Sequence, residues 1–206
     1  MYLKRKADAY LNAWKSDPNR SPLIIKGPRQ VGKTETIDYF AAHNYRSVVE
    51  INFVEEPKYR AITADGYGAN TIVRNISLID PAKKFIPGDT LIFFDEIQAH
   101  PDIVTALKFF KIDGKYDVIC SGSMLGISYK QIESNSVGYK TDYEMRSLDF
   151  EEFLWARGYD EAVIESMFTH LCDATPFSEV EMNVFSTAFM DYCVLGGMPA
   201  VVASHI

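Results

Sequence analysis

The sequence predicts an α/β fold: a three-layer sandwich with a central parallel sheet, followed by a small helical segment. Between residues 20 and 150, short apolar runs alternate with stretches of helical periodicity, and several of these runs are apolar on both faces. Such runs are typical of strands in a parallel sheet that helices cover on both sides. After residue 150 only helical patterns follow. We therefore expect two parts, residues 1–150 and residues 151–206, the second being the start of a longer C-terminal region.

The first four elements are expected before residue 55. Apolar side chains recur at helical spacing from Leu3 to Trp14 and predict an amphipathic helix. The run at residues 22–26 predicts a strand, residues 34–43 a helix, and the β-branched run at residues 47–54 a second strand.

The later elements follow the same alternation of helices and strands. Pro101 is expected at the first turn of its helix, and Asp149 with Glu152 has capping-box spacing at the start of another. The expected helices are a short one within residues 55–68, then residues 70–80, 101–111, 161–171 and 178–195, besides the one that Asp149 caps. The expected strands are residues 90–94, 116–120 and 143–148.

Composition narrows the classes of partner and location. The net charge is −7, and a protein that depends on contacts to a phosphate backbone usually has a basic excess, so nucleic acid is left open as a partner but is not indicated. The apolar runs are too short to cross a bilayer, and the basic N-terminus lacks the apolar stretch of a signal peptide. We expect a cytoplasmic protein with no membrane contact.

Cys120, Cys172 and Cys193 lack metal-site spacing and are expected to be buried, reduced thiols.

One motif lies between the first expected strand and the helix after it. It matches G-x-x-x-x-G-K-[ST] at every fixed position and consists of Gly27, Pro28, Arg29, Gln30, Val31, Gly32, Lys33 and Thr34. In this motif, a P-loop, backbone N–H groups surround the β-phosphate of a nucleotide and the helix N-terminus faces the anion. We expect Gly32 to permit close backbone approach, Lys33 to reach the β- and γ-phosphates, and the Thr34 hydroxyl to bind Mg²⁺.

Two acids follow the buried run at residues 90–94 and complete the expected chemistry. Asp95 is expected to hold Mg²⁺, directly or through water, and Glu96 to act as the general base on the attacking water. Ser121, after the next strand, is the first candidate for a catalytic sensor of the γ-phosphate, and Ser123 is the second.

Gln98 and His100 follow the acidic pair directly. Either they contact the γ-phosphate or a neighbouring subunit, or they only begin the next helix, which is the slightly favoured interpretation.

ATP is the expected nucleotide, because the only stretch that resembles the guanine-reading [NT]KxD motif, at residues 114–117, lacks the Asn or Thr and precedes its strand. No motif spacing identifies one arginine of the sequence as catalytic. Arg146 is the first choice, since it lies on the expected last strand, and the other candidates are Arg29, Arg74 and Arg157. A homo-oligomer, or a partner protein, that supplies an arginine in trans therefore stays open.

By these motifs the chain resembles the AAA-type P-loop ATPases of bacteria and archaea in which a C-terminal domain of unknown function follows the ATPase core. The stretches that carry the resemblance are Lys4-Arg5-Lys6, residues 27–34, residues 94–98, residues 121–123, residues 148–154 and Gly196-Gly197-Met198-Pro199. The resemblance implies an ATPase core with a parallel sheet, then a helical region, and it carries over Lys33, Thr34, Asp95 and Glu96.

Two features depart from that family. Many relatives have Gly-Arg before the last strand, where this chain has Gly138-Tyr139-Lys140, and relatives usually continue well past Gly-Gly-Met-Pro. We therefore expect the chain to carry the ATPase core without the whole C-terminal domain.

The leading hypothesis is an ATPase that hydrolyses ATP to ADP and phosphate with Mg²⁺. The alternative is a nucleotide-gated switch with little hydrolysis, in which nucleic acid is one potential associate. A small-molecule kinase is disfavoured because residues 123–136 contain no arginine for a lid over the phosphates, and DNA binding by the helical tail is disfavoured by its many acids.

Overall fold

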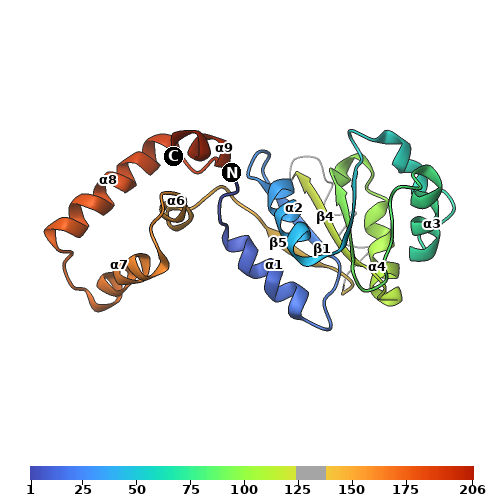
Figure 1. Ribbon diagram of the computed structural model, residues 1–206, viewed down its shortest axis with the longest axis horizontal. Coiled ribbons are helices and arrows are strands. Elements are labelled where there is room, and N and C mark those ends of the chain that lie inside the picture. The colour runs from blue at the N-terminus through green and yellow to red at the C-terminus, as the bar shows by residue number, and fades with distance from the viewer. Residues whose placement is uncertain (124–137) are drawn as a thin grey trace.

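A computed structural model describes residues 1–123 and 138–206. In these ranges five parallel strands form one sheet in the order β2-β3-β4-β1-β5, with helices on both faces (Figure 1). The strands are β1 Leu23–Gly27, β2 Ser47–Asn52, β3 Thr90–Asp95, β4 Asp117–Ser123 and β5 Thr141–Glu144. The predicted α/β class with a central parallel sheet is confirmed.

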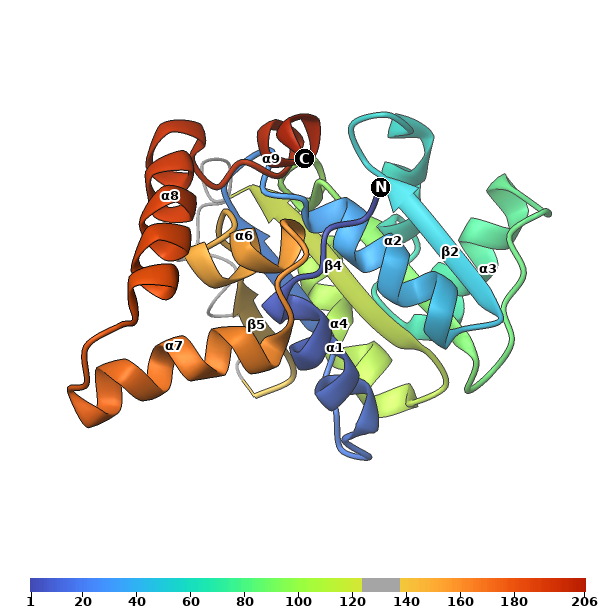
Figure 2. The ribbon, with the colours of Figure 1, turned by 60° about the vertical axis from the view of Figure 1, so that its left-hand side comes forward.

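Two sets of helices cover the two faces of the sheet. Helices α1 (Lys6–Ser16) and α2 (Lys33–Asn44) pack on one face. The opposite face is covered by α3 (Ala69–Ile79), α4 (Ile103–Asp113) and the 3-10 helices η1 (Pro57–Thr63) and η2 (Ile97–Ala99). Figure 2 shows α1 and α2 in front of the strands and α4 behind them.

Strand β3, which lies inside the sheet between β2 and β4, shows why this arrangement is stable. Its side chains alternate between the faces, so Phe93 packs with α1 and α2 while Phe94 packs with α3 and α4. Both rings are fully buried. A strand that is buried on both faces must be apolar at successive positions, which is the pattern that residues 90–94 show in the sequence.

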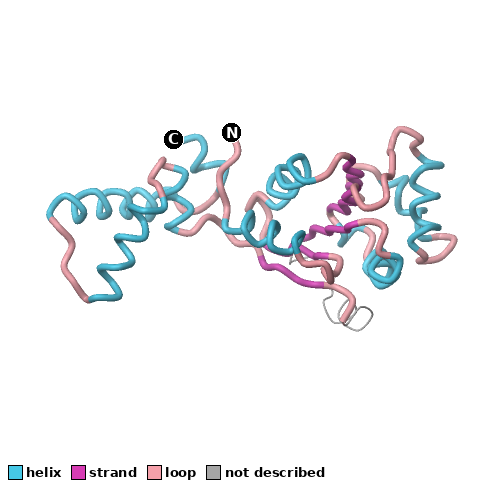
Figure 3. The backbone as a smooth tube through the Cα atoms, turned by 60° about the horizontal axis from the view of Figure 1, so that its bottom comes forward, coloured by secondary structure: helices cyan, strands magenta, loops and turns pink. Residues whose placement is uncertain are grey.

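The C-terminal helices extend to one side of the sheet (Figure 3). Helix α6 begins at the predicted capping box of Asp149 and Glu152, and Ser178 caps α8 in the same way with Glu181. The bounds are α6 Phe150–Ala156, α7 Glu161–Asp173, α8 Glu179–Leu195 and α9 Pro199–His205. A small core holds α6, α7 and α8 together.

Several sequence-based boundaries are wrong. The last strand was expected at residues 143–148, but β5 begins at Thr141 and ends at Glu144, where its pairing with Lys26 of β1 ends. The chain then leaves the sheet, and the Leu148 N–H donates to the Gly197 carbonyl at 2.8 Å.

Two further differences concern the ends of the chain and the thiols. The first helix begins at Lys6, after Leu3, and α9 was not predicted. Of the cysteines only Cys120 is buried, whereas Cys172 and Cys193 are exposed on α7 and α8.

The sequence argument against a kinase concerns residues 123–136, and all of these after Ser123 lie outside the described residues. Within the described ranges no helix is long and apolar enough to cross a membrane.

Candidate nucleotide-binding site

The P-loop connects the end of β1 to the start of α2. Gln30 and Gly32 both have positive φ, 64° and 87°, and Gly32 is the N-cap residue of α2 without a side chain that caps the helix. The first N–H groups of α2 therefore lack intrahelical partners and face the loop. This is the arrangement in which a helix N-terminus attracts an anion.

The two glycines of the loop are required for reasons that the sequence did not reveal. A Cβ atom on Gly27 would lie 2.0 Å from the carbonyl oxygen of Met145, so only glycine permits β1 to pass that close to the chain after β5. A Cβ atom on Gly32 would lie 3.5 Å from Nη1 of Arg5 and 3.6 Å from Cγ of Pro199. The positive φ of Gly32 is one reason for a glycine at this position, and its close approach to a phosphate stays a prediction.

The Lys33 ammonium lies over the loop. Its Nζ donates to the carbonyl oxygens of Gly27 at 3.1 Å and Pro28 at 2.6 Å. Burial lowers the pKa of the Lys33 side chain, and the carboxylates of Glu96 and Asp95 act in the opposite direction. The side chain is thus half-buried close to both predicted acids.

Three of the predicted site residues meet at the carboxyl-terminal edge of the sheet. The Thr34 hydroxyl, at the start of α2, donates to Oδ2 of Asp95 at 3.2 Å. The Ser121 hydroxyl on β4 donates to the other oxygen, Oδ1. Asp95 itself is only 4% exposed. Since β4 lies between β1 and β3, the end of β4 delivers Ser121 directly beside Asp95. Ser123, the second candidate, pairs with Gly27 in the sheet instead.

Glu96 has a backbone conformation that is rare for a residue with a side chain. Its φ is 53°, in the left-handed region, which costs on the order of 1–3 kcal/mol and is commonest at functional sites. The Glu96 N–H donates to Oδ1 of Asp95 at 2.9 Å, and the Gln98 side-chain amide donates to the Glu96 carboxylate. Gln98 therefore holds the predicted base in place from the 3-10 helix η2.

Asn52 is a site residue that the sequence reasoning missed. It ends β2 in register with Asp95, and its Nδ2 lies 3.5 Å from Oδ2 of Asp95, at the outer limit of a hydrogen bond. Its Oδ1 accepts from the N–H groups of Val54 and Glu55. The signal was available, because a polar residue that ends a strand next to β3 must lie at the same edge of the sheet.

Two acids near Asp95, Asp38 and Glu50, have a raised proton affinity. Burial, then the charge of Asp95, raises the pKa of Asp38. Burial and the charges of Asp38 and Asp95 raise the pKa of Glu50. This edge of the sheet is therefore negative and favours a cation.

The residues at this edge fit a magnesium ion that a nucleotide shares. Among the described residues no group of three or more His, Cys, Asp or Glu could hold a metal by itself. Mg²⁺ at nucleotide sites needs few protein oxygens, because phosphate and water supply the rest. Oγ1 of Thr34 and Oδ2 of Asp95 are 3.2 Å apart, close to the ~2.9 Å between adjacent ligands of an octahedral ion with bonds of 2.0–2.1 Å.

His100 lies behind the site. It is 8% exposed, its Nε2 is 3.0 Å from the Thr63 hydroxyl, and its ring packs against Phe53 with 4.9 Å between ring centroids. Burial lowers the pKa of His100. These contacts fit the slightly favoured interpretation, in which His100 serves the fold before α4 rather than a phosphate.

The arginine candidates lie away from the acidic pair or are exposed. Arg146 follows β5 instead of lying on it, which corrects the reason for its first place, and its exposed side chain pairs with Glu144 at 3.1 Å. Arg157 pairs with Asp191 in the helical segment. Arg29 in the loop and Arg74 on α3 are both exposed.

A different arginine joins the loop to the C-terminal helices. Arg5 is 5% exposed, and its Nη1 donates to the Val31 carbonyl at 2.7 Å. Its Nη2 donates to the Arg146 carbonyl at 2.6 Å, and its Nε pairs with Glu152 at 3.1 Å. One guanidinium thus ties the P-loop, the segment after β5 and the first turn of α6 together. The sequence reasoning gave Arg5 no role.

The fold and the loop together define a P-loop NTPase fold. A family described as "AAA domain" matches residues 19–154, and the chain therefore belongs to the AAA domain family. Its core is a nucleotide-binding ATPase module.

No curated protein matches the chain. Among solved structures, the chain is similar to PCH-2 of C. elegans, at 10% sequence identity and a TM-score of 0.46. The match covers 86% of this chain and 50% of that chain, so this chain spans about half the length of PCH-2.

Proposed function

We propose that this module binds Mg·ATP and hydrolyses it to ADP and phosphate. The single observation that supports this most is the meeting of Thr34, Asp95 and Ser121 at one edge of the sheet. The loop that carries Lys33 starts at this same edge. A merely structural turn between a strand and a helix would not need a buried carboxylate that two hydroxyl groups orient.

In the proposed binding mode, the backbone N–H groups of residues 27–34 surround the phosphates and the Lys33 ammonium neutralises the β- and γ-phosphates. To do so, Lys33 exchanges the carbonyl oxygens of Gly27 and Pro28 for phosphate oxygens. Thr34 and Asp95 would hold the magnesium ion, which when bound neutralises charge on the phosphates.

The proposed chemical step needs little from the protein beyond position and charge. The oxygen of a water molecule bonds to the γ-phosphorus while the bond to the β–γ bridging oxygen breaks, and the Glu96 carboxylate accepts the proton of that water. Gln98 holds the Glu96 carboxylate, and Ser121 fixes the Asp95 carboxylate by its hydrogen bond. In the role proposed from the sequence, Ser121 also senses the γ-phosphate.

The wider setting is part of the same proposal. Residues 1–150 form the ATPase core, residues 151–206 form a helical segment that follows it, and the protein acts in the cytoplasm. An arginine from a second copy or a partner protein completes the site in trans, because the described arginines other than Arg29 make their contacts elsewhere or lie on other elements.

Two variants test this proposal. Glu96→Gln should keep Mg·ATP affinity within about threefold and lower phosphate release by at least about 100-fold, in line with the loss of a general base. Lys33→Ala should lose binding and turnover together. The matched control is Glu55→Gln, which removes a charge from an exposed glutamate beside the site and should leave turnover unchanged. Undiminished phosphate release from Glu96→Gln would remove Glu96 from the base role.

A nucleotide-gated switch with little hydrolysis is the second candidate, and the contacts of Arg5 favour it. They run from the Val31 carbonyl in the loop to Glu152 in α6, so movement of the loop displaces Arg5 and α6 with it or breaks the buried hydrogen bond of Arg5 to Val31. Turnover per chain, measured against protein concentration, separates the two. A switch stays slow at every concentration, whereas an arginine in trans makes the turnover rise.

A further inference from the structure

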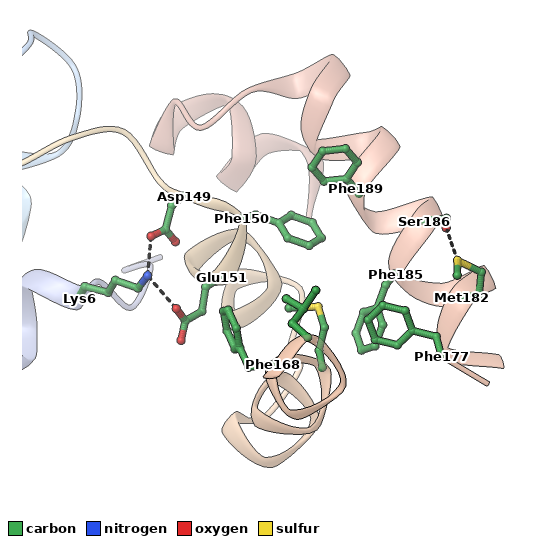
Figure 4. Close-up of a pocket in the computed structure, with 12 residues that line it drawn as sticks. Lys6, Asp149, Phe150, Glu151, Phe168, Phe177, Met182, Phe185, Ser186 and Phe189 are labelled. Atoms are coloured by element: carbon green, nitrogen blue, oxygen red, sulfur yellow. Dashed lines mark hydrogen bonds and ion pairs between the residues drawn. The ribbon is translucent and has the colours of Figure 1, made fainter. Parts of the chain in front are cut away.

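The helical segment contains an open apolar groove between α6, α7 and α8. Its volume is about 540 Å³. Figure 4 shows aromatic side chains from all three elements around this space, with Phe150 from α6, Phe168 from α7 and Phe189 from α8. At one end, Lys6 pairs with Asp149 at 2.5 Å and with Glu151 at 2.7 Å. None of the residues that line the groove belongs to the P-loop.

The apolar side chains of this groove are exposed to an unusual degree. Phe168 is 44% exposed, Leu171 66% and Phe189 50%. Phe168 and Leu171 lie on α7 and Phe189 lies on α8, and all three line the groove. Exposed apolar side chains that line one groove mark a site of interaction rather than ordinary surface. The core that α6, α7 and α8 do share is small and leaves these side chains outside it.

The charge of this segment indicates what covers the groove. From residue 149 onward the chain has a single arginine, Arg157, and no lysine. Against it stand ten acids: Asp149, Glu151, Glu152, Asp160, Glu161, Glu165, Asp173, Glu179, Glu181 and Asp191. Since the whole chain has a net charge of only −7, its acidity is concentrated in the segment that contains the groove, and two of these acids, Asp149 and Glu151, line the groove itself.

We propose that the groove docks an amphipathic helix of a partner protein, with leucine, phenylalanine or methionine on one face and lysine or arginine on the other. An apolar groove between helices takes such a helix through anchors at positions i, i+3, i+4 and i+7. Methionine side chains such as Met167 and Met182 adapt to anchors of different shape. Helix α8, with 17 residues, is about 25 Å long and can lie along a partner helix of similar length.

The same charges argue against other occupants. A second copy would bring an identical set of acids against the first, because a two-fold interface places the same surface on both sides. Anionic lipid and nucleic acid are repelled for the same reason. A basic amphipathic helix is complementary both to the apolar groove and to the net negative charge of the segment that contains it.

The test uses the full chain and a designed, fluorescein-labelled 18-residue helix. Its apolar face carries leucine and phenylalanine, and its other face carries lysine and arginine. Fluorescence anisotropy should show saturable binding that weakens with added salt. A control peptide with the same apolar face, and glutamate in place of lysine and arginine, should bind at least about tenfold more weakly.

Two exposed substitutions locate the site. Phe168→Ser and Leu171→Ser should each weaken binding of the basic peptide at least about tenfold. Leu78→Ser changes an equally exposed apolar side chain on α3 (67% exposed) and should have no effect. Circular dichroism establishes that each variant is folded.

Three results of the peptide experiments would overturn the proposal. They are absence of binding by the basic peptide, equal binding of the acidic peptide, and binding that neither groove variant weakens. Analytical ultracentrifugation tests whether a second copy of the chain occupies the groove. If the wild-type chain is a dimer and Phe168→Ser is a monomer, the groove serves self-association instead.

Discussion

Replacement of Arg5 by methionine should loosen the connection between the P-loop and the C-terminal helices. Methionine keeps an unbranched apolar stem of similar length but removes the guanidinium. The carbonyl oxygens of Val31 and Arg146 then lose their donors, and Glu152 loses its ionic partner in a place where both side chains are about 95% buried.

The magnitude follows from these contacts. Removal of one partner of a buried ion pair costs ~3–5 kcal/mol of unfolding free energy. Glu152 still accepts from the N–H groups of Lys6 at 2.7 Å and Asp149 at 3.1 Å, so its charge is not left without partners. We therefore expect a loss of ~3 kcal/mol, which for a chain of this size lowers the melting temperature by roughly 6–12 °C.

Urea unfolding, followed by circular dichroism, measures this loss. The double variant with Glu152→Gln should be more stable than the sum of the two single losses, by ~1–3 kcal/mol of coupling. Arg46→Met is the control, since Arg46 pairs with Asp89 at the surface with 77% of its side chain exposed, and should cost less than ~1 kcal/mol. A loss below ~1 kcal/mol for Arg5→Met would refute the reasoning, as would strict additivity with Glu152→Gln.

Two further predictions follow from burial. Gly27→Ala should lower the free energy of unfolding by ~1–3 kcal/mol in a urea titration, because its Cβ atom would lie 2.0 Å from the Met145 carbonyl oxygen. The control is Gly68→Ala, whose Cβ atom would meet only the Thr71 hydroxyl at 3.5 Å, and it should cost less than ~1 kcal/mol. Burial lowers the pKa of His100 from its usual 6.5, so the fold favours the neutral ring, and its contribution is complete above about pH 6.5 and is lost as the pH falls through the lowered pKa. The wild-type chain should lose up to ~1.4 kcal/mol per pH unit in that window, and His100→Gln should show a shallower slope; identical slopes would contradict this assignment.

Local patterns predicted most of the fold because each element carries its own evidence. The sheet strands are apolar at successive positions, and the capping box of Asp149 and Glu152 fixes the start of α6 within four residues of sequence. The P-loop and Asp95 were predictable for the same reason, since a motif and a strand end are both local. Their meeting then follows from a parallel sheet, in which the carboxyl ends of all strands share one edge.

The features that the sequence did not predict depend on contacts between segments that are distant in the chain. Arg5 and Glu152 are 147 positions apart, and nothing near Arg5 indicates that its guanidinium is buried. The end of β5 depends on its pairing with β1, a strand more than 100 positions earlier in the chain, and this pairing stops at Lys26 and Glu144. Helix α9 has only seven residues, too few to be stable alone, and is held by Val202 against Leu3 and Leu148.

The central claim is that Lys33 and the Thr34–Asp95 pair capture the phosphates and metal of Mg·ATP. Isothermal titration calorimetry of Mg·ATP into the folded chain tests it most directly. We predict heat from one site per chain, which Lys33→Ala abolishes, and a gain in affinity from Mg²⁺ that Asp95→Asn largely removes. Absence of heat from the folded wild-type chain, or equal affinity of the wild type and Lys33→Ala, would contradict the claim.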